Sequence, residues 1–171
     1  MPELTLQERL QPSLLDRLTD DDPQRQQESR GERVMSMRQL REGVLRDLGW
    51  LMNTSNLTSV HDLAPFPQVA QSVLNYGVPD LTGLTVSSVD VVELERAIRQ
   101  AVVRFEPRLL PHTVRVRVVA SDEHMSHNAL TFFVEAQLWA QPLPLQMFLK
   151  TEIDLELGNV TVVEQAAQET R

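Results

Sequence analysis

The apolar residues of this chain change their spacing once, close to Pro107, and this change constrains the fold more than any other feature. Before Pro107 they recur every three or four residues, which is typical of amphipathic helices. After it they alternate with polar residues, which is typical of strands with one buried face. Helices followed by strands predict an α+β fold, with N-terminal helices and then a small antiparallel β-sheet of three to four strands.

The spacing predicts three helices between Val34 and Pro107. The first ends near Asn53, and a short second one covers about residues 68–74. The third has the clearest stripe, and Ser87 with Asp90 resembles a capping box at its start. The stripes of the first and third helices consist of Met37, Leu40, Val44, Leu48 and Leu51, and of Val91, Leu94, Ile98, Ala101, Val102 and Phe105.

The alternating pattern predicts strands over about residues 114–118, 130–138 and 147–157. The first two strands are separated by a polar turn, SDEHMSHN, and should form a hairpin. Gly158 and Asn159 offer a tight turn before a fourth short run at 160–163.

Residues 1–33 are expected to form a flexible extension to a single domain at 34–171. The run TDDDPQRQQESRGER is charged and lacks apolar periodicity, as solvated linkers do. Ahead of it, Leu14, Leu15 and Leu18 have helical spacing, and Ser13 can cap the first turn. This short amphipathic helix could dock onto a partner or fold back onto its own domain, and the sequence leaves both possibilities open.

Composition narrows the function. The chain has no cysteine, which excludes disulfides and Cys-based zinc sites and fits a cytoplasmic protein. Its formal net charge of −8 would repel phosphate backbones, so nucleic acid is not an expected partner. No run approaches the ~20 apolar residues of a membrane span, and the first residues lack a signal-peptide pattern, so membrane insertion is not expected.

Residues suited to catalysis or metal binding are scarce. His124 and His127 lie close together beside two acidic residues, but a third ligand would have to come from elsewhere, so no metal is expected. There is no nucleophile elbow and no glycine-rich phosphate loop, so no cofactor is expected. No Glu is followed by an acidic residue at the nine-residue spacing of phage-type lysozymes, so the sequence predicts no enzyme.

Opposite charges flank a proline in the segment FEPRL, at the end of the third helix. A glutamate here opposes the negative end of the helix dipole, so Glu106 requires another reason for its position. A local ion pair with Arg108 and a charged anchor for a partner explain the pattern equally well from the residues alone.

Several motifs occur together and in order. FEPRL, RDLGWLMNT (Arg46 to Thr54), SVLNYGVPDLTG (Ser72 to Gly83) and SLLDRL near the start resemble the TssE family of type VI secretion baseplate subunits. That family is related to the gene-25-type wedge proteins of contractile phage baseplates. The departures are slight, since Met52 and Val78 stand where the family pattern suggests leucine.

The resemblance implies a wedge component that joins TssF and TssG, with TssK a further candidate partner, at the cytoplasmic, inner-membrane-docked baseplate. It also implies that the chain anchors the first ring of the contractile sheath, built of TssB and TssC, by sharing β-strands in a handshake-like sheet. The Glu-Pro-Arg motif of the family falls on Glu106, Pro107 and Arg108, so the resemblance favours partner binding by these residues over a role in folding. The family was once labelled lysozyme-like, so a muramidase is the alternative function, and an adaptor acting through its N-terminal helix is a third.

Overall fold

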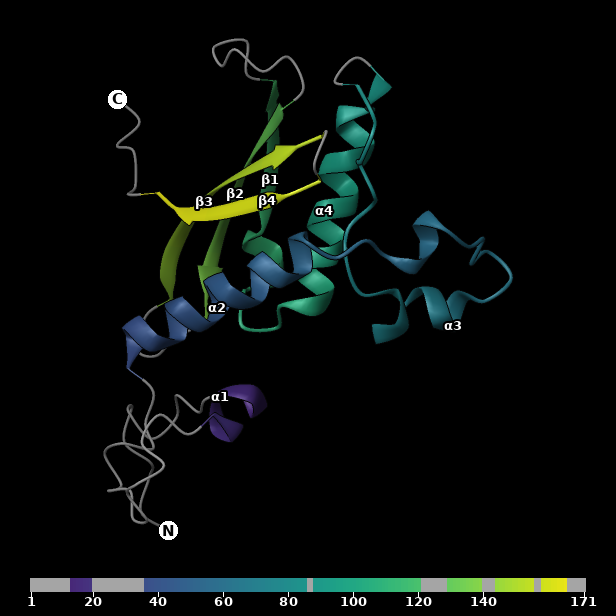
Figure 1. Cartoon of the computed structure of the whole chain (residues 1–171). Coiled ribbons are helices and arrows are strands. Elements are labelled where there is room, and N and C mark those ends of the chain that lie inside the picture. The colour runs from purple at the N-terminus through teal and green to yellow at the C-terminus, as the bar shows by residue number, and fades with distance from the viewer. Residues whose placement is uncertain are drawn as a thin grey trace.

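The computed structural model describes residues 13–19, 36–85, 88–120, 129–139, 144–155 and 158–165. Over these ranges helices precede a four-stranded antiparallel sheet (Figure 1), which confirms the predicted α+β class. The helices are α1 (Leu14–Leu18), α2 (Met37–Met52), α3 (Pro67–Ala70) and α4 (Val91–Phe105), with short 3-10 turns at Leu57–Ser59, Val73–Asn75 and Pro111–Thr113.

The strands are β1 (Arg115–Ala120), β2 (Ala129–Leu138), β3 (Leu145–Asp154) and β4 (Val160–Glu164). They lie in the order β1-β2-β3-β4, so each strand pairs with its neighbour in the sequence. Val134 in the middle of the sheet faces Val116 on one side and Leu149 on the other. All four predicted strands are present, with their ends shifted by a few residues.

Side chains define where the two long helices begin. Ser36 and Gln39 form a capping box at the start of α2. At the start of α4 the cap is Asp90, whose carboxylate accepts a hydrogen bond from the Glu93 amide at 3.0 Å. Ser87, which the sequence placed in this cap, lies outside the described residues.

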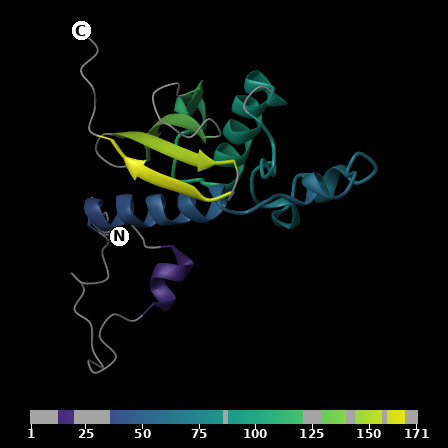
Figure 2. The same ribbon diagram turned by 45° about the horizontal axis from the view of Figure 1, so that its top comes forward.

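The core lies between the sheet and the two long helices. Figures 1 and 2 show α2 running along β4, while α4 lies beside β1. Both helices turn their apolar stripes inward, as their spacing predicts, except that Val91 in the first turn of α4 is exposed. The most deeply buried side chains include Val44, Leu48, Ile98, Val102, Phe132, Leu138 and Met147.

The segment between α2 and α4 extends away from the sheet (Figure 1) and is fastened at its base. Ser55 and Val78 form a short parallel bridge there. Gly77 next to it has φ +121°, and a Cβ at this position would lie 2.2 Å from the carbonyl oxygen of Thr54. Only glycine permits this close approach of two backbone segments.

Two predictions fall on residues that the structure does not describe. The linker run, apart from Thr19, is one of them, so the domain boundary between residues 33 and 34 stays a prediction. The loop that carries His124 and His127 is the other. No helix among the described residues is long and apolar enough to cross a membrane.

Candidate functional site

The FEPRL segment forms a fixed corner between α4 and the sheet. Helix α4 ends where the Glu106 amide donates to the Val102 carbonyl at 2.9 Å, and Pro107 then prevents its continuation. Two further bonds fasten the corner to the end of β2. The Leu110 amide donates to the Gln137 carbonyl at 2.8 Å, and the Trp139 amide donates to the Arg108 carbonyl at 2.7 Å.

Glu106 is buried at this corner, with 2% of its surface exposed. Its Oε1 accepts from the Arg108 amide at 3.1 Å and from Arg108 Nε at 2.7 Å. Its Oε2 accepts from Arg108 Nη2 at 2.6 Å. The two side chains therefore form a bidentate pair, the strongest arrangement available to a carboxylate and a guanidinium.

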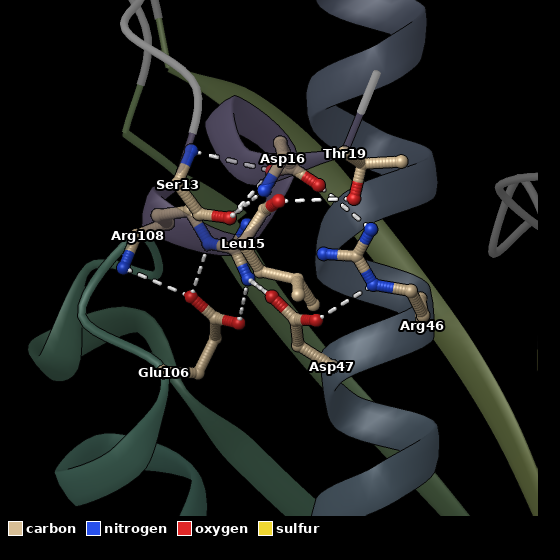
Figure 3. A network of polar contacts seen from close by, with 8 residues as sticks. All are labelled: Ser13, Leu15, Asp16, Thr19, Arg46, Asp47, Glu106 and Arg108. Atoms are coloured by element: carbon tan, nitrogen blue, oxygen red, sulfur yellow. Dashed lines mark hydrogen bonds and ion pairs between the residues drawn. The ribbon is translucent and has the colours of Figure 1, made fainter. Parts of the chain in front are cut away.

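The pair continues into a row of alternating charges (Figure 3). Arg108 Nη2 also contacts Asp47 Oδ2 on α2. Asp47 Oδ1 accepts from Arg46 Nε at 2.9 Å, and Arg46 Nη1 lies 2.7 Å from Asp16 Oδ1 on α1. We call Glu106, Arg108, Asp47, Arg46 and Asp16 the ion-pair chain; it joins α1 and α2 to the corner that follows α4.

The environment of the ion-pair chain shifts several pKa values. Burial acts to lower the pKa of Arg108, but the hydrogen bonds and charges of Glu106 and then Asp47 raise it well above its usual range. Burial acts to raise the pKa of Asp16, but the hydrogen bonds from Ser13 and Arg46 lower it by more. Burial, followed by the charges of Asp47 and Glu106, raises the pKa of nearby Tyr76.

Helix α1 meets the rest of the molecule through its polar side. Ser13 caps it as predicted, because its hydroxyl accepts from the Asp16 amide at 3.3 Å. Asp16 points toward Arg46, whereas Leu14 and Leu18 are 72% and 74% exposed. Two of the three leucines of the predicted apolar stripe therefore face solvent, while Leu15 is 42% exposed. The side chains of Arg46 and Asp16 are 35% and 13% exposed, and an ion pair that keeps this contact with water contributes about 1 kcal/mol.

Two guanidinium nitrogens near α1 are buried and have no acceptor among the described residues: Arg108 Nη1 and Arg46 Nη2. Both lie close to Gly43 on α2. A Cβ on Gly43 would be 3.4 Å from Arg108 Nη1, 3.6 Å from Asp16 Oδ2 and 4.0 Å from Arg46 Nη2. These are ordinary contact distances, so a methyl group would fit here, and a longer side chain would meet both guanidinium groups and the Asp16 carboxylate.

The structure brings Glu106, Pro107 and Arg108 together, as the motif requires, and places α1 beside Arg46 through Asp16. Sequence reasoning missed Asp47, Arg46 and Asp16. Their charges resembled the solvated face of an amphipathic helix. The available signal was Gly43, because a glycine inside a helical pattern often marks a close approach.

The edge of the sheet at β1 is occupied by side chains of α4. Glu95 Oε1 accepts from the outward-pointing Val118 amide at 2.8 Å. Arg99 Nε donates to the Val114 carbonyl at 2.9 Å. These contacts satisfy backbone groups that an added strand would need.

At the opposite edge, β4, side chains of the described residues bond the outward backbone only at the start of the strand. The Asn53 side chain bonds the outward Val160 backbone twice, donating to its carbonyl at 2.8 Å and accepting from its amide at 2.9 Å. The pairing with β3 leaves Val162 and Glu164 with their backbone groups pointing the same way as those of Val160. The second half of β4 therefore presents the freer edge.

The described residues contain no group of three or more His, Cys, Asp or Glu side chains arranged to bind a metal ion.

The family model of the baseplate wedge protein gp25 matches residues 38–143, from the first turn of α2 to beyond β2. The chain belongs to this family of baseplate wedge proteins. Its members are structural components of phage-tail-like baseplates, and a structural role in such a baseplate follows for this chain. No curated protein and no solved structure gives a significant match.

Proposed function

We propose that the chain is a TssE-type wedge subunit of a type VI secretion baseplate. In this role it joins TssF and TssG, with TssK as a further candidate partner, on the cytoplasmic side of the inner membrane. It anchors the first ring of the TssB–TssC sheath. The observation that carries the proposal is the family match over residues 38–143, which includes the FEPRL corner.

The charged corner and the exposed stripe of α1 support two contact regions. The first is the corner of Glu106, Pro107 and Arg108, where Pro107 and Arg108 reach the surface and the buried Glu106 positions Arg108. The second is formed by Leu14, Leu15 and Leu18. Because removing apolar surface from water lowers the free energy, binding of a partner over these exposed leucines would be favourable. The chain is also acidic overall, which suits a protein partner better than a phosphate backbone.

Co-expression with TssF and TssG tests this function. We expect the three proteins to copurify, and sheath assembly in cells to require this chain.

Replacing Leu14 and Leu18 together by serine should weaken the complex, whereas Val60→Ser, a matched change at another exposed apolar residue, should not. Arg108→Lys should also weaken it, because an ammonium cannot reproduce the planar fork. Failure of the unmodified chain to copurify would contradict the proposal.

Strand sharing with the sheath would use the second half of β4. Val162→Pro removes an outward amide that an added strand needs, yet breaks no bond to β3, because the amides paired with β3 alternate with it. We expect this variant to fold and to fail in sheath assembly. The matched change Val116→Pro, on the edge covered by α4, should leave assembly intact if it folds. Normal assembly with Val162→Pro would exclude this edge.

A further inference from the structure

We propose that α1 is a displaceable latch over Arg46 and Arg108, and that a carboxylate of a wedge partner replaces Asp16 when the chain enters the baseplate. The inference rests on the proposed function, because it specifies how that partner is recognised. In the free protein, Asp16 occupies the position that the carboxylate of the partner takes in the complex.

The first argument is the orientation of α1. The helix has only five residues, too few to be stable on its own in water. Leu14 and Leu18 are mostly exposed and only Leu15 is about half covered, so apolar burial contributes little to holding α1 in place. The one ion pair between α1 and another helix in the described structure joins Asp16 to Arg46 (Figure 3). A contact of this kind is easily exchanged for a similar one.

The second argument is the pair of buried donors without acceptors. Arg46 Nη2 and Arg108 Nη1 both approach the space beside Gly43, where Asp16 Oδ2 also lies. Buried N–H groups are nearly always paired in folded proteins. Asp16, which bonds Arg46 through Nη1 alone, leaves this donor site incompletely filled.

The third argument concerns charge. Without Asp16 the ion-pair chain consists of two arginines and two carboxylates and is neutral, with three unused N–H-bearing nitrogens: Arg46 Nη1, Arg46 Nη2 and Arg108 Nη1. One additional carboxylate with two acceptor oxygens fits these donors. A phosphate of nucleic acid offers similar oxygens, but its backbone would be repelled by the net charge of −8. We therefore assign the site to an aspartate or glutamate of a protein partner.

The first experiment examines the latch without a partner. Because the chain lacks cysteine, Thr19→Cys places a single fluorescent or spin label directly after α1 in the full-length protein. We expect Asp16→Asn to increase the mobility of the label. Glu42→Gln, which removes the same charge from an exposed pair with Arg38, should not change it. Equal mobility in the Asp16→Asn variant and its parent would overturn the latch.

The second experiment titrates the same proteins with purified TssF–TssG complex. Since Asp16 competes with the partner, Asp16→Asn should tighten binding by about two- to fivefold, the factor that corresponds to a surface ion pair. Arg46→Gln also releases α1 but removes the donors, so it should weaken binding. Opposite signs for these two variants support the inference, and weaker or unchanged binding by Asp16→Asn overturns it. If the parent does not bind at all, the proposed function fails, while the label still decides whether Asp16 anchors α1.

Discussion

At the scale of single residues, Glu106 is the only charged side chain in the described structure that is fully buried. Glu106→Ala would leave the partly buried Arg108 without its bidentate partner, and breaking such a pair costs about 3 kcal/mol of unfolding free energy. Glu42→Ala, at the exposed pair with Arg38, should cost less than about 0.5 kcal/mol. Urea unfolding followed by circular dichroism compares the two.

This expectation differs from the one drawn from sequence, where the motif was assigned to partner binding and not to folding. The burial of Glu106 and its bonds to Arg108 now give the corner a structural role as well. If Glu106→Ala is as stable as Glu42→Ala, the ion-pair chain contributes nothing to folding. Partner capture, measured separately, decides the other role.

A second prediction at this scale concerns two glycines with positive φ. Gly77→Ala places a Cβ against the Thr54 carbonyl at 2.2 Å, so the backbone bridge must open. Gly83 has φ +78° but no atom within 4 Å of an added Cβ. We expect Gly83→Ala to cost only the ~1–2 kcal/mol of a left-handed alanine, and Gly77→Ala to cost clearly more. Chemical denaturation of both variants provides the test, and similar losses would contradict it.

The residues of the FEPRL corner could be predicted because a proline and two charges end a strongly periodic helix. Asp47 and Asp16 could not, since a charge between apolar residues is usually a solvated one. Which of many surface charges meet depends on the packing of α2 against α4. The packing of these two helices is determined by many core residues together, so no single sequence motif predicts which charges meet.

At the scale of elements, the attachment of α1 should depend on pH. The Asp16 carboxylate has a lowered pKa, so protons bind it more weakly when α1 is attached than when it is free. The attachment is therefore fully present above the ordinary aspartate pKa of about 3.9 and is lost as the pH falls through the lowered value. The label on Thr19→Cys should become more mobile upon acidification below about pH 4, while circular dichroism reports the fold.

The same titration with Asp16→Asn is the control for this prediction. That variant should show a mobile label at every pH, because it lacks the titrating carboxylate. A parent label that stays rigid down to the pH at which the fold itself is lost would mean that another contact fastens α1.

Helices and strands followed from periodicity, since one buried face dictates a spacing of 3.6 or 2 residues. The apolar stripe around Val44 and Leu48 was sufficient to predict α2, and the alternation around Phe132 was sufficient to predict β2. The capping of the sheet edges was not predictable. Asn53 reads as a helix-ending residue, and its bonds to Val160 require the sheet to be assembled first.

At the scale of the whole molecule, we predict no hydrolase activity. The carboxylate of the FEPRL corner is buried behind Arg108 and Asp47, out of reach of a polymer. Purified protein should release no more soluble fragments from peptidoglycan than a boiled sample does. Release that disappears upon replacement of one glutamate would establish the muramidase alternative.

The antiparallel order of the four strands has a mechanical consequence. Hydrogen bonds between such strands run perpendicular to the chain direction. A pull along a strand added to β4 would therefore load all the bonds of the β3–β4 ladder in shear at the same time, and would not open them one by one. Helix α2 is fastened to both ends of β4, by Asn53 at Val160 and by Arg41 at Glu164, so it would carry part of the same tension.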